Sequence, residues 1–95
     1  MGLCFEWDSK KADSNRSKHR VPFEEALTVF SDKLAKIHDD EDHSAYEHRE
    51  IIIGHSSRRR LLIVSFAAHG DNVRIFSARP ATRRERIDYE ECRDP

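Results

Sequence analysis

The second half of the chain contains four short apolar segments, and only brief polar turns separate them. These segments lie at residues 34–38, 49–55, 60–67 and 73–78, and each has the length of a strand. The third is nearly continuously apolar, as expected of a central strand. Consecutive strands with short connections pair most simply as an antiparallel meander. In the last strand, alternation predicts one face with Val73, Ile75 and Ser77 and the other with Arg74, Phe76 and Ala78.

Helical patterns precede this strand region. A polar helix is expected over residues 9–19, with Asp8 as its N-cap. One side of that helix carries Lys11, Asn15, Lys18 and His19. A second helix is expected over residues 22–31, because Pro22 suits a first turn and the apolar residues that follow have helical spacing. Glu25 lies in the first turn of this helix, where the helix dipole favours acids.

Two further elements complete the expected order. Phe5 and Trp7 alternate with polar residues and indicate a short strand. Thr82 followed by Glu85 is a capping box, which predicts a C-terminal helix that runs to about Glu91. We therefore expect a two-layer α+β fold with a four- to five-stranded, mainly antiparallel sheet, two N-terminal helices and one C-terminal helix. At 95 residues, the chain is expected to be a single domain, residues 1–95.

Charged side chains are distributed in blocks along the chain. The sequence has 17 Lys and Arg against 18 Asp and Glu, so a net charge of −1 conceals the pattern. Residues 8–20 and 56–86 are basic, whereas residues 21–50 and 88–94 are acidic. If the two basic blocks meet in the fold, they form a surface for an anionic partner such as nucleic acid.

Several classes of protein are excluded. No apolar run approaches the roughly 20 residues that a membrane span needs. The first residues have neither the basic nor the apolar region of a secretory signal. Cys4 and Cys92 lie near opposite termini, so they are either two free thiols or a single clasp, and not a disulfide framework. We therefore expect a cytoplasmic protein with no membrane partner.

A series of short motifs follows in a specific order along nearly the whole chain. The series comprises Phe5-Glu6-Trp7-Asp8, Lys11, Asn15, Lys18-His19, Phe23-Glu24-Glu25-Ala26, Val29-Phe30, Asp42-His43-Ser44, Arg49, Ile53-Gly54, Leu61-Leu62, Arg74-Ile75, Ser77-Ala78-Arg79, Ala81-Thr82-Arg83-Arg84-Glu85-Arg86 and Tyr89-Glu90. Each motif is weak alone, but their joint order and spacing resemble the BrnT family of toxins from bacterial type II toxin–antitoxin systems.

The resemblance implies both an activity and a partner. It implies a small ribonuclease with a RelE-like fold that cleaves RNA and arrests growth. It also implies a BrnA-like antitoxin with a ribbon-helix-helix DNA-binding part, which masks the toxin and represses the shared operon. Operator DNA would then be reached only through the antitoxin.

The chain departs from the family pattern at three places. Arg20 stands where Gly is usual, and residues 57–60 are Ser-Arg-Arg-Arg in a turn that commonly carries Gly. Both changes add basic charge, which favours RNA binding. Where the family often has a Thr together with charged residues, this chain has Ala67-Ala68-His69. This change removes side chains that could belong to a site.

The resemblance directs attention to groups that can cleave RNA without a metal or a cofactor. Such cleavage uses the 2′-hydroxyl group as the nucleophile and needs an acid, a base and cations around the phosphate. The acid–base candidate is His19, because histidine titrates closest to neutral pH. Arg79 and Arg49 are the candidate catalytic cations, because a guanidinium group on a strand is rigidly aimed and grips phosphate in two places. The candidate RNA-binding residues are Lys11, Lys18, Arg74, Arg83 and Arg59.

Simpler interpretations stand beside these assignments. His19 could cap carbonyl groups at a helix end, and Arg79 could form a salt bridge with Glu47, Glu50 or Glu85. The aromatic residues Trp7, Phe23 and Phe30 have the spacing of core residues rather than of base-stacking residues. The segment from Asp39 to His43 suggests a metal site but lacks the Gly and the terminal Glu of an EF-hand loop, so an acidic surface loop is preferred.

Two functions therefore remain open from the sequence. One is a metal-independent endoribonuclease toxin that loses activity when single Arg or His residues become Ala. The other is a noncatalytic binding module that acts only within an antitoxin–DNA repressor complex and binds its partner unchanged after those substitutions. A standalone RNA-binding domain has only its charge in its favour.

Overall fold

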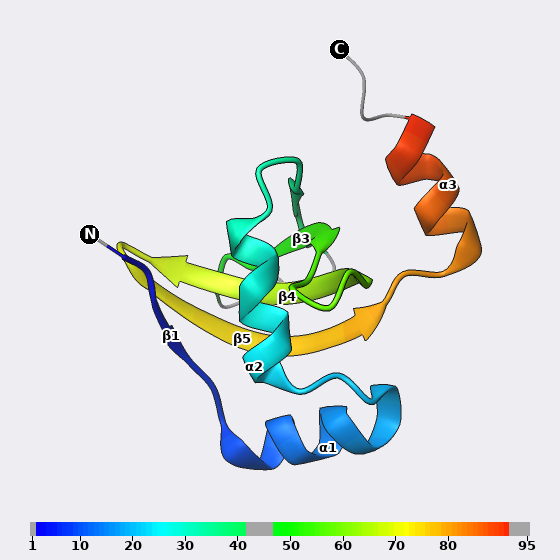
Figure 1. The fold of residues 1–95 in the computed structure, drawn as a ribbon. Coiled ribbons are helices and arrows are strands. Elements are labelled where there is room, and N and C mark those ends of the chain that lie inside the picture. Colours follow the sequence, from blue (N-terminus) through cyan, green and yellow to red (C-terminus); the bar gives the residue numbers. More distant parts are fainter. Residues whose placement is uncertain (1, 42–46, 92–95) are drawn as a thin grey trace.

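Five strands form one mixed sheet in the computed structural model, which describes residues 2–41 and 47–91 (Figure 1). The strands are β1 (Cys4–Glu6), β2 (Lys36–Asp39), β3 (Glu50–His55), β4 (Leu61–His69) and β5 (Asn72–Pro80). Their order across the sheet is β1-β5-β4-β3-β2. The pairs β2–β3, β3–β4 and β4–β5 are antiparallel, which confirms the predicted meander, and β1 pairs with β5 in parallel.

The first helix, α1 (Ser9–His19), has the predicted bounds. The carboxylate of Asp8 accepts hydrogen bonds from the backbone N–H groups of Lys10 and Lys11, as expected of an N-cap. Its only buried residue, Asn15, exchanges hydrogen bonds of 2.8 and 3.0 Å with the backbone of Ala78 on β5. The amide of Asn15 thus takes the place of a neighbouring strand along the part of β5 that β1 does not reach.

The second expected helix is shorter and less regular than predicted. Its α-helical part, α2, covers only Phe23–Ala26, and a 3-10 helix, η1, continues over Leu27–Ser31. The hydroxyl of Thr28 donates a hydrogen bond of 2.6 Å to the carbonyl of Glu25 and accepts one from the N–H of Ser57. A side chain that binds a carbonyl of the preceding turn competes with the regular helical bond, which explains the early end of α2.

The main core lies between one face of the sheet and the segment that contains α1, α2 and η1 (Figure 1). Phe23 is fully buried there, and Trp7 and Phe30 pack against the same cluster. The expectation that these aromatic residues serve the core is therefore confirmed. The opposite face of the sheet is called here the open face.

The last helix, α3 (Arg83–Glu91), projects beyond one end of the sheet (Figure 1). The predicted capping box is present: Thr82 N–H donates to Glu85 Oε1 at 2.8 Å, and Glu85 N–H donates to Thr82 Oγ1 at 3.1 Å. Tyr89 anchors the helix, because its ring is buried beside Ile53 and Leu61 and its hydroxyl donates to the carbonyl of Leu34. These residues form a small second cluster that is separate from the main core.

A β-bulge interrupts the pairing of β4 with β5. Ser65 pairs with Ser77 and Phe66 pairs with Ile75, so Phe76 is an extra residue on β5. The predicted alternation along this strand is therefore wrong beyond Phe76. Sequence periodicity cannot reveal such a bulge, because the bulge depends on how two strands pair.

The bulge changes the face on which the last residues of β5 lie. Ala78 lies in the main core with Ile75, although strict alternation predicts opposite faces for these two residues. Ser77 and Arg79 consequently lie on the open face, where Arg79 is directly opposite Ile63 of β4. Without the extra residue, Arg79 would point toward the helix-covered core.

Both departures from family glycines coincide with a left-handed backbone. Arg20 follows α1 with φ 59°, and Arg59 lies in the β3–β4 turn with φ 64°. Glycine adopts this conformation without strain, whereas other residues are disfavoured in it.

The predicted acidic loop lies mostly outside the described residues, since residues 42–46 are not described. Within the described part of the chain, no helix is long and apolar enough to cross a membrane.

Candidate functional site

Two connected hollows lie on the open face of the sheet. The first, called here the cation hollow, has a volume of about 400 Å³ and is lined by side chains that include Lys11, Arg49, Ser65, Phe76, Ser77 and Arg79. The second, called here the isoleucine hollow, has a volume of about 460 Å³ and is lined by side chains that include Lys36, His38, Ile51, Ile53, Ile63 and Tyr89. Ile51, Ile63 and Arg79 line both hollows, so the two form one continuous depression.

The cation hollow brings together three cations that the sequence analysis named. Lys11 comes from α1, Arg49 from the residue before β3, and Arg79 from the end of β5. Lys11 and Arg79 belong to the two different basic blocks of the sequence, so the condition that these blocks meet in the fold is fulfilled here. Three positive charges around one depression create a site that suits a phosphate group.

Phe76 holds two of these cations in place. The guanidinium carbon of Arg49 lies 3.8 Å from the centre of the Phe76 ring, and the Lys11 ammonium group lies 5.2 Å from it. Both distances are within the range of cation–π attraction. The Phe76 ring lies on the open face by ordinary strand alternation, and the bulge then turns Arg79 onto the same face.

Arg79 is bound to Glu85 at the first turn of α3. Two parallel hydrogen bonds join them, from Arg79 Nη1 to Glu85 Oε1 at 2.7 Å and from Arg79 Nη2 to Glu85 Oε2 at 2.8 Å. The pKa of Glu85 is lowered to about 2, mainly by the hydrogen bonds from the Arg79 guanidinium and in addition by the capping bonds with Thr82. The predicted salt bridge is thus present, and it lies at the rim of both hollows.

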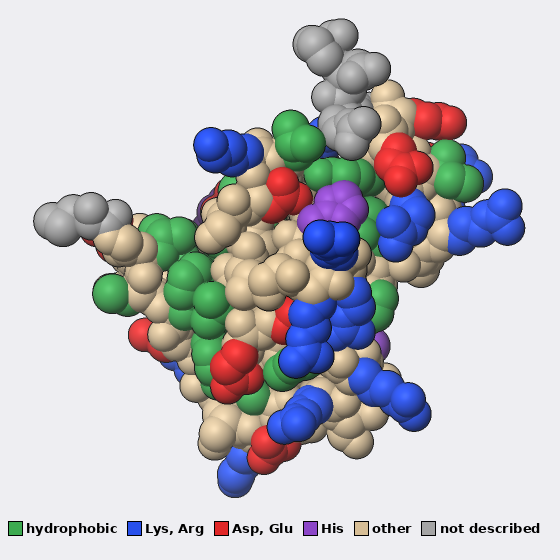
Figure 2. Space-filling view, in the orientation of Figure 1, with side chains coloured by type: hydrophobic (Ala, Val, Ile, Leu, Met, Phe, Trp, Pro, Cys, Tyr) green, Lys and Arg blue, Asp and Glu red, His purple; other side chains and the backbone are tan. Residues whose placement is uncertain are grey.

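The other predicted site residues lie away from the cation hollow. Arg74 pairs with Glu6 of β1 at 3.2 Å. The four remaining candidates are absent from the described lining of either hollow, and they are His19, Lys18, Arg59 and Arg83. His19 is partly buried at the end of α1, whereas Lys18, Arg59 and Arg83 are exposed. Lys and Arg side chains also gather on the helix-covered face, toward the side where α3 lies (Figure 2).

Among the titratable lining residues that the sequence analysis did not name as site candidates, two lie close together at β2, His38 and Asp40. Asp40 is nearly buried and lines the cation hollow, which Arg49 also lines. His38 precedes Asp40 by two residues in the sequence and lines the isoleucine hollow. Alternation along β2 places both on the open face. The segment from Asp39 onward was interpreted as a surface loop because of its acidic composition, which concealed this alternation.

Glu47 and His69 form an ion pair near the cation hollow. Glu47 Oε2 lies 2.8 Å from His69 Nε2. This hydrogen bond is the main cause that lowers the pKa of Glu47, and the charges of Arg49 and Arg74 add to the effect. The unusual Ala67-Ala68-His69 segment thus supplies one member of this pair, His69.

An ion pair between a buried carboxylate, that of Glu25, and the partly exposed Arg60 stabilises the turn that carries the arginine run. Glu25 is 4% exposed, and its carboxylate accepts hydrogen bonds from Ser56 Oγ at 2.6 Å and from Arg60 Nε at 2.9 Å, with a further bond from Arg60 Nη2. The hydrogen bonds from Arg60 are the main cause that lowers the pKa of Glu25. Arg60 also donates to the carbonyl of Arg20. Arg60 is therefore a structural residue, although the sequence analysis counted it among the basic residues of this turn that favour RNA binding.

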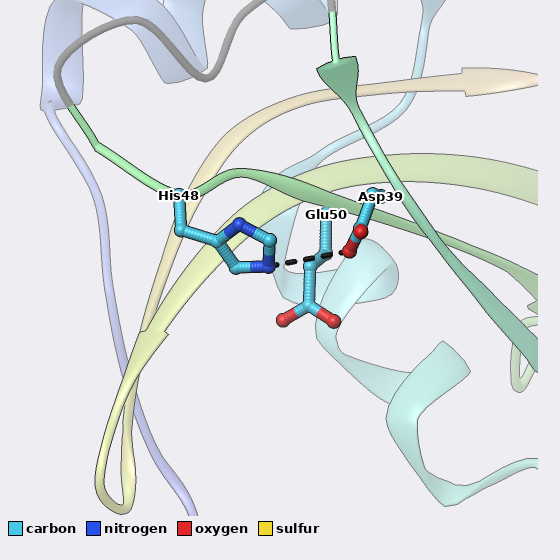
Figure 3. A group of neighbouring side chains, drawn as sticks. All are labelled: Asp39, His48 and Glu50. Carbon is cyan, nitrogen blue, oxygen red and sulfur yellow. Dashed lines mark ion pairs between the residues drawn. The ribbon is translucent and has the colours of Figure 1, made fainter.

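A cluster of three metal-ligating residue types lies elsewhere, at the edge of the sheet (Figure 3). The ligand atoms of Asp39, His48 and Glu50 lie within 4.8 Å of one another, and His48 pairs with Asp39 at 3.2 Å. Asp39 pairs in register with Glu50, and Ile37 pairs with the core residue Ile52, so both carboxylates lie on the helix-covered face. The cluster is thus separate from the depression, and two residues of the acidic segment from Asp39 to His43, Asp42 and His43, lie outside the described residues.

The chain matches the sequence pattern of a known family over residues 7–85, and that family is described as "Ribonuclease toxin, BrnT, of type II toxin-antitoxin system". Among solved structures, it is similar to the 1.1 Å crystal structure of the Brucella abortus ribonuclease toxin BrnT, with a TM-score of 0.65 and 23% sequence identity, over 85% of this chain and 99% of that chain. The structural match supports the α+β fold, while a likeness to RelE stays a prediction. Curated protein sequences give no significant match. From the family match over most of its length, the chain belongs to the BrnT ribonuclease toxins of type II toxin–antitoxin systems.

Proposed function

We propose that this chain is a metal-independent endoribonuclease whose reaction takes place in the cation hollow. The observation that carries the proposal is the convergence of Lys11, Arg49 and Arg79, from three separate elements, on one depression of the open face. In this reaction the 2′-oxygen of a ribose attacks the adjacent phosphorus and the bond to the 5′-oxygen breaks. The products are a 2′,3′-cyclic phosphate end and a 5′-hydroxyl end.

The three cations suit the charge that develops during this reaction. The phosphorane transition state carries more negative charge on its equatorial oxygens than the phosphodiester, so fixed cations stabilise it preferentially. Arg49 is held by the Phe76 ring and Arg79 by Glu85, and a side chain that is already fixed loses little freedom when phosphate binds. The hydroxyl groups of Ser65 and Ser77 line the same hollow and can donate further hydrogen bonds to phosphate oxygens.

We assign the acid–base role to His38 rather than to His19. Proton transfer requires a group within hydrogen-bond reach of the reacting oxygens. His38 lines the depression, whereas His19 is absent from its described lining. His19 stays the alternative acid–base group, and His69 of the Glu47–His69 pair beside Arg49 is a third candidate. The histidine variants described below distinguish the three.

The partner assignments follow from the family. We propose that a BrnA-like ribbon-helix-helix antitoxin neutralises this chain in the cytoplasm, and that operator DNA is reached only through the antitoxin. The open face is the surface that such an antitoxin has to cover or distort in order to block RNA.

A cleavage assay in the presence of EDTA tests the proposed function. End-labelled RNA of mixed sequence is incubated with the antitoxin-free protein, and the product ends are identified. Replacement of Lys11, Arg49 or Arg79 by Ala is expected to lower kcat by about 10²-fold, the usual effect of removing one transition-state contact. Lys10→Ala and Arg84→Ala are the matched controls, because both residues are exposed and lie outside the described lining of the hollows.

Three histidine variants, His38→Asn, His19→Asn and His69→Asn, identify the acid–base group. The variant that removes this group is expected to lower kcat and to change the pH dependence of kcat/KM. Cleavage that EDTA abolishes and Mg²⁺ restores would contradict metal independence. Intact RNA from a folded protein that still binds its antitoxin would instead favour the noncatalytic module.

A further inference from the structure

We infer that the isoleucine hollow is a subsite for one nucleobase of the RNA, and this inference rests on the proposed function. The hollow shares Ile51, Ile63 and Arg79 with the cation hollow, so a nucleotide whose phosphate lies among the cations has its base within reach of the isoleucine floor. The occupant follows from this continuity, because the group attached to a bound phosphate through one ribose is a base.

The floor of the isoleucine hollow has the character of a stacking surface. Ile53 of β3 pairs directly with Ile63 of β4, and Ile51 lies two residues before Ile53 on the same face. The Tyr89 ring closes the side formed by α3. An apolar floor accepts the apolar face of any base by hydrophobic contact.

The rim of the hollow carries polar groups of both signs. Lys36 and His38 line it from β2, and Glu85 and Asp88 line it from α3. The carboxylate of Glu85 is occupied by Arg79 and Thr82, whereas Asp88 is 59% exposed and makes one described contact, a pair with Arg84 at 3.4 Å. A base needs this combination, because its faces are apolar while its edge carries hydrogen-bond donors and acceptors.

The size of the hollow also suits this occupant. About 460 Å³ holds a base and its ribose but leaves no room for a stack of several nucleotides. The subsite therefore contacts one base, next to the scissile phosphate. A site of this kind orients the ribose and fixes which phosphodiester bond lies among the cations.

Methyl NMR spectroscopy tests the subsite without any cleavage. The protein is labelled at its isoleucine methyl groups and titrated with two trimers, an RNA trinucleotide with methylated 2′-hydroxyl groups and the same sugar–phosphate chain without bases. The two probes have the same charge, so they differ only in their bases. An aromatic base over the floor shifts the methyl signals of Ile51, Ile53 and Ile63. The signals of Ile37 and Ile87, which are 53% and 40% exposed and lie outside the described lining, serve as controls within the molecule.

The expected result is a shift of the three floor signals with the base-containing trimer only, together with about tenfold tighter binding than the abasic trimer. Ile53→Ala, at a position that lines the isoleucine hollow and not the cation hollow, is expected to weaken binding of the base-containing trimer and to leave that of the abasic trimer unchanged, whereas Ile37→Ala changes neither. Equal affinities and equal spectra for the two trimers would overturn the subsite. If Arg49 side-chain signals still respond to both trimers, the phosphate site and the proposed function stand. If neither trimer shifts the methyl signals of the floor, the subsite is also overturned. A protein partner is then the remaining candidate for the hollow.

Discussion

Arg79 and Glu85 are joined by two parallel hydrogen bonds, 2.7 and 2.8 Å long, across the turn between β5 and α3. This pair connects the sheet that carries the cation hollow to the helix that walls the isoleucine hollow. The same carboxylate accepts the N–H of Thr82 and so completes the capping box. One glutamate therefore orients the arginine, caps the helix and occupies donors that a phosphate would otherwise use.

Glu85→Gln is expected to weaken this pair. The free energy of unfolding should fall by about 1 kcal/mol at pH 7, because the pair is partly exposed to solvent and is screened. RNA binding should tighten by about threefold, since the Arg79 guanidinium then interacts less strongly with its own neighbour. Urea unfolding and a salt-controlled RNA titration measure the two effects. Glu90→Gln, at an exposed position of the same helix, is the matched control.

The stabilising effect of Glu85 should depend on pH in a defined direction. Its pKa is lowered from 4.5 to about 2 in the folded protein, so the folded state favours the ionised carboxylate. The stabilisation is fully present above pH 4.5 and is lost as the pH falls through about 2. The difference in unfolding free energy between the unaltered protein and Glu85→Gln should therefore shrink between pH 4.5 and pH 2. A difference that stays constant over this range would show that the charge of Glu85 is not its cause.

The meander and both helix caps could be predicted from the sequence because they depend on local patterns. Asp8 caps α1 and Thr82 caps α3 as expected, since each cap involves residues within three positions. Short connections likewise identify antiparallel neighbours from sequence alone. The early end of α2 was missed, because Thr28 bonds both to its own helix and to Ser57, which is distant in the sequence.

The candidate site could be predicted only in part, for a related reason. Lys11, Arg49 and Arg79 were named from charge and resemblance, but their convergence requires the bulge at Phe76. That bulge depends on the pairing of β5 with β4, which no pattern within β5 reveals. His38 lies within a predicted strand, but its place in the depression depends on how β2 pairs with β3, which no pattern within β2 reveals.

Arg60→Ala is expected to destabilise the protein far more than other arginine substitutions in the same turn. It leaves the buried carboxylate of Glu25 without its main partner, which costs about 1–3 kcal/mol here because the Arg60 side chain is itself 35% exposed. Arg58→Ala, at an exposed position, should change the free energy of unfolding by less than about 0.5 kcal/mol. Denaturant unfolding monitored by circular dichroism gives both values.

A double variant separates the cost of the lone charge from that of lost packing. Replacement of Glu25 by Leu together with Arg60 by Met removes both charges and keeps much of the buried volume, so it should recover most of the lost stability. A double variant as unstable as Arg60→Ala would show that the unpaired carboxylate is not the source of the loss. The cation hollow contains neither residue in its described lining, so RNA cleavage by the double variant should be retained.

Arg59→Gly is expected to stabilise the protein, although most substitutions by glycine destabilise. Arg59 has φ 64°, a left-handed conformation that costs a residue with a side chain about 1–2 kcal/mol. Glycine avoids this strain but loses more entropy on folding, so a net gain of about 0.5–1 kcal/mol is expected. Arg58→Gly is the matched control, because Arg58 is adjacent, exposed and without a positive φ, and it should lower stability by about 0.5–1 kcal/mol. Thermal unfolding of the two variants at equal ionic strength should therefore move Tm in opposite directions. A loss of stability in both would indicate that the Arg59 side chain contributes more to the folded state than its backbone conformation costs.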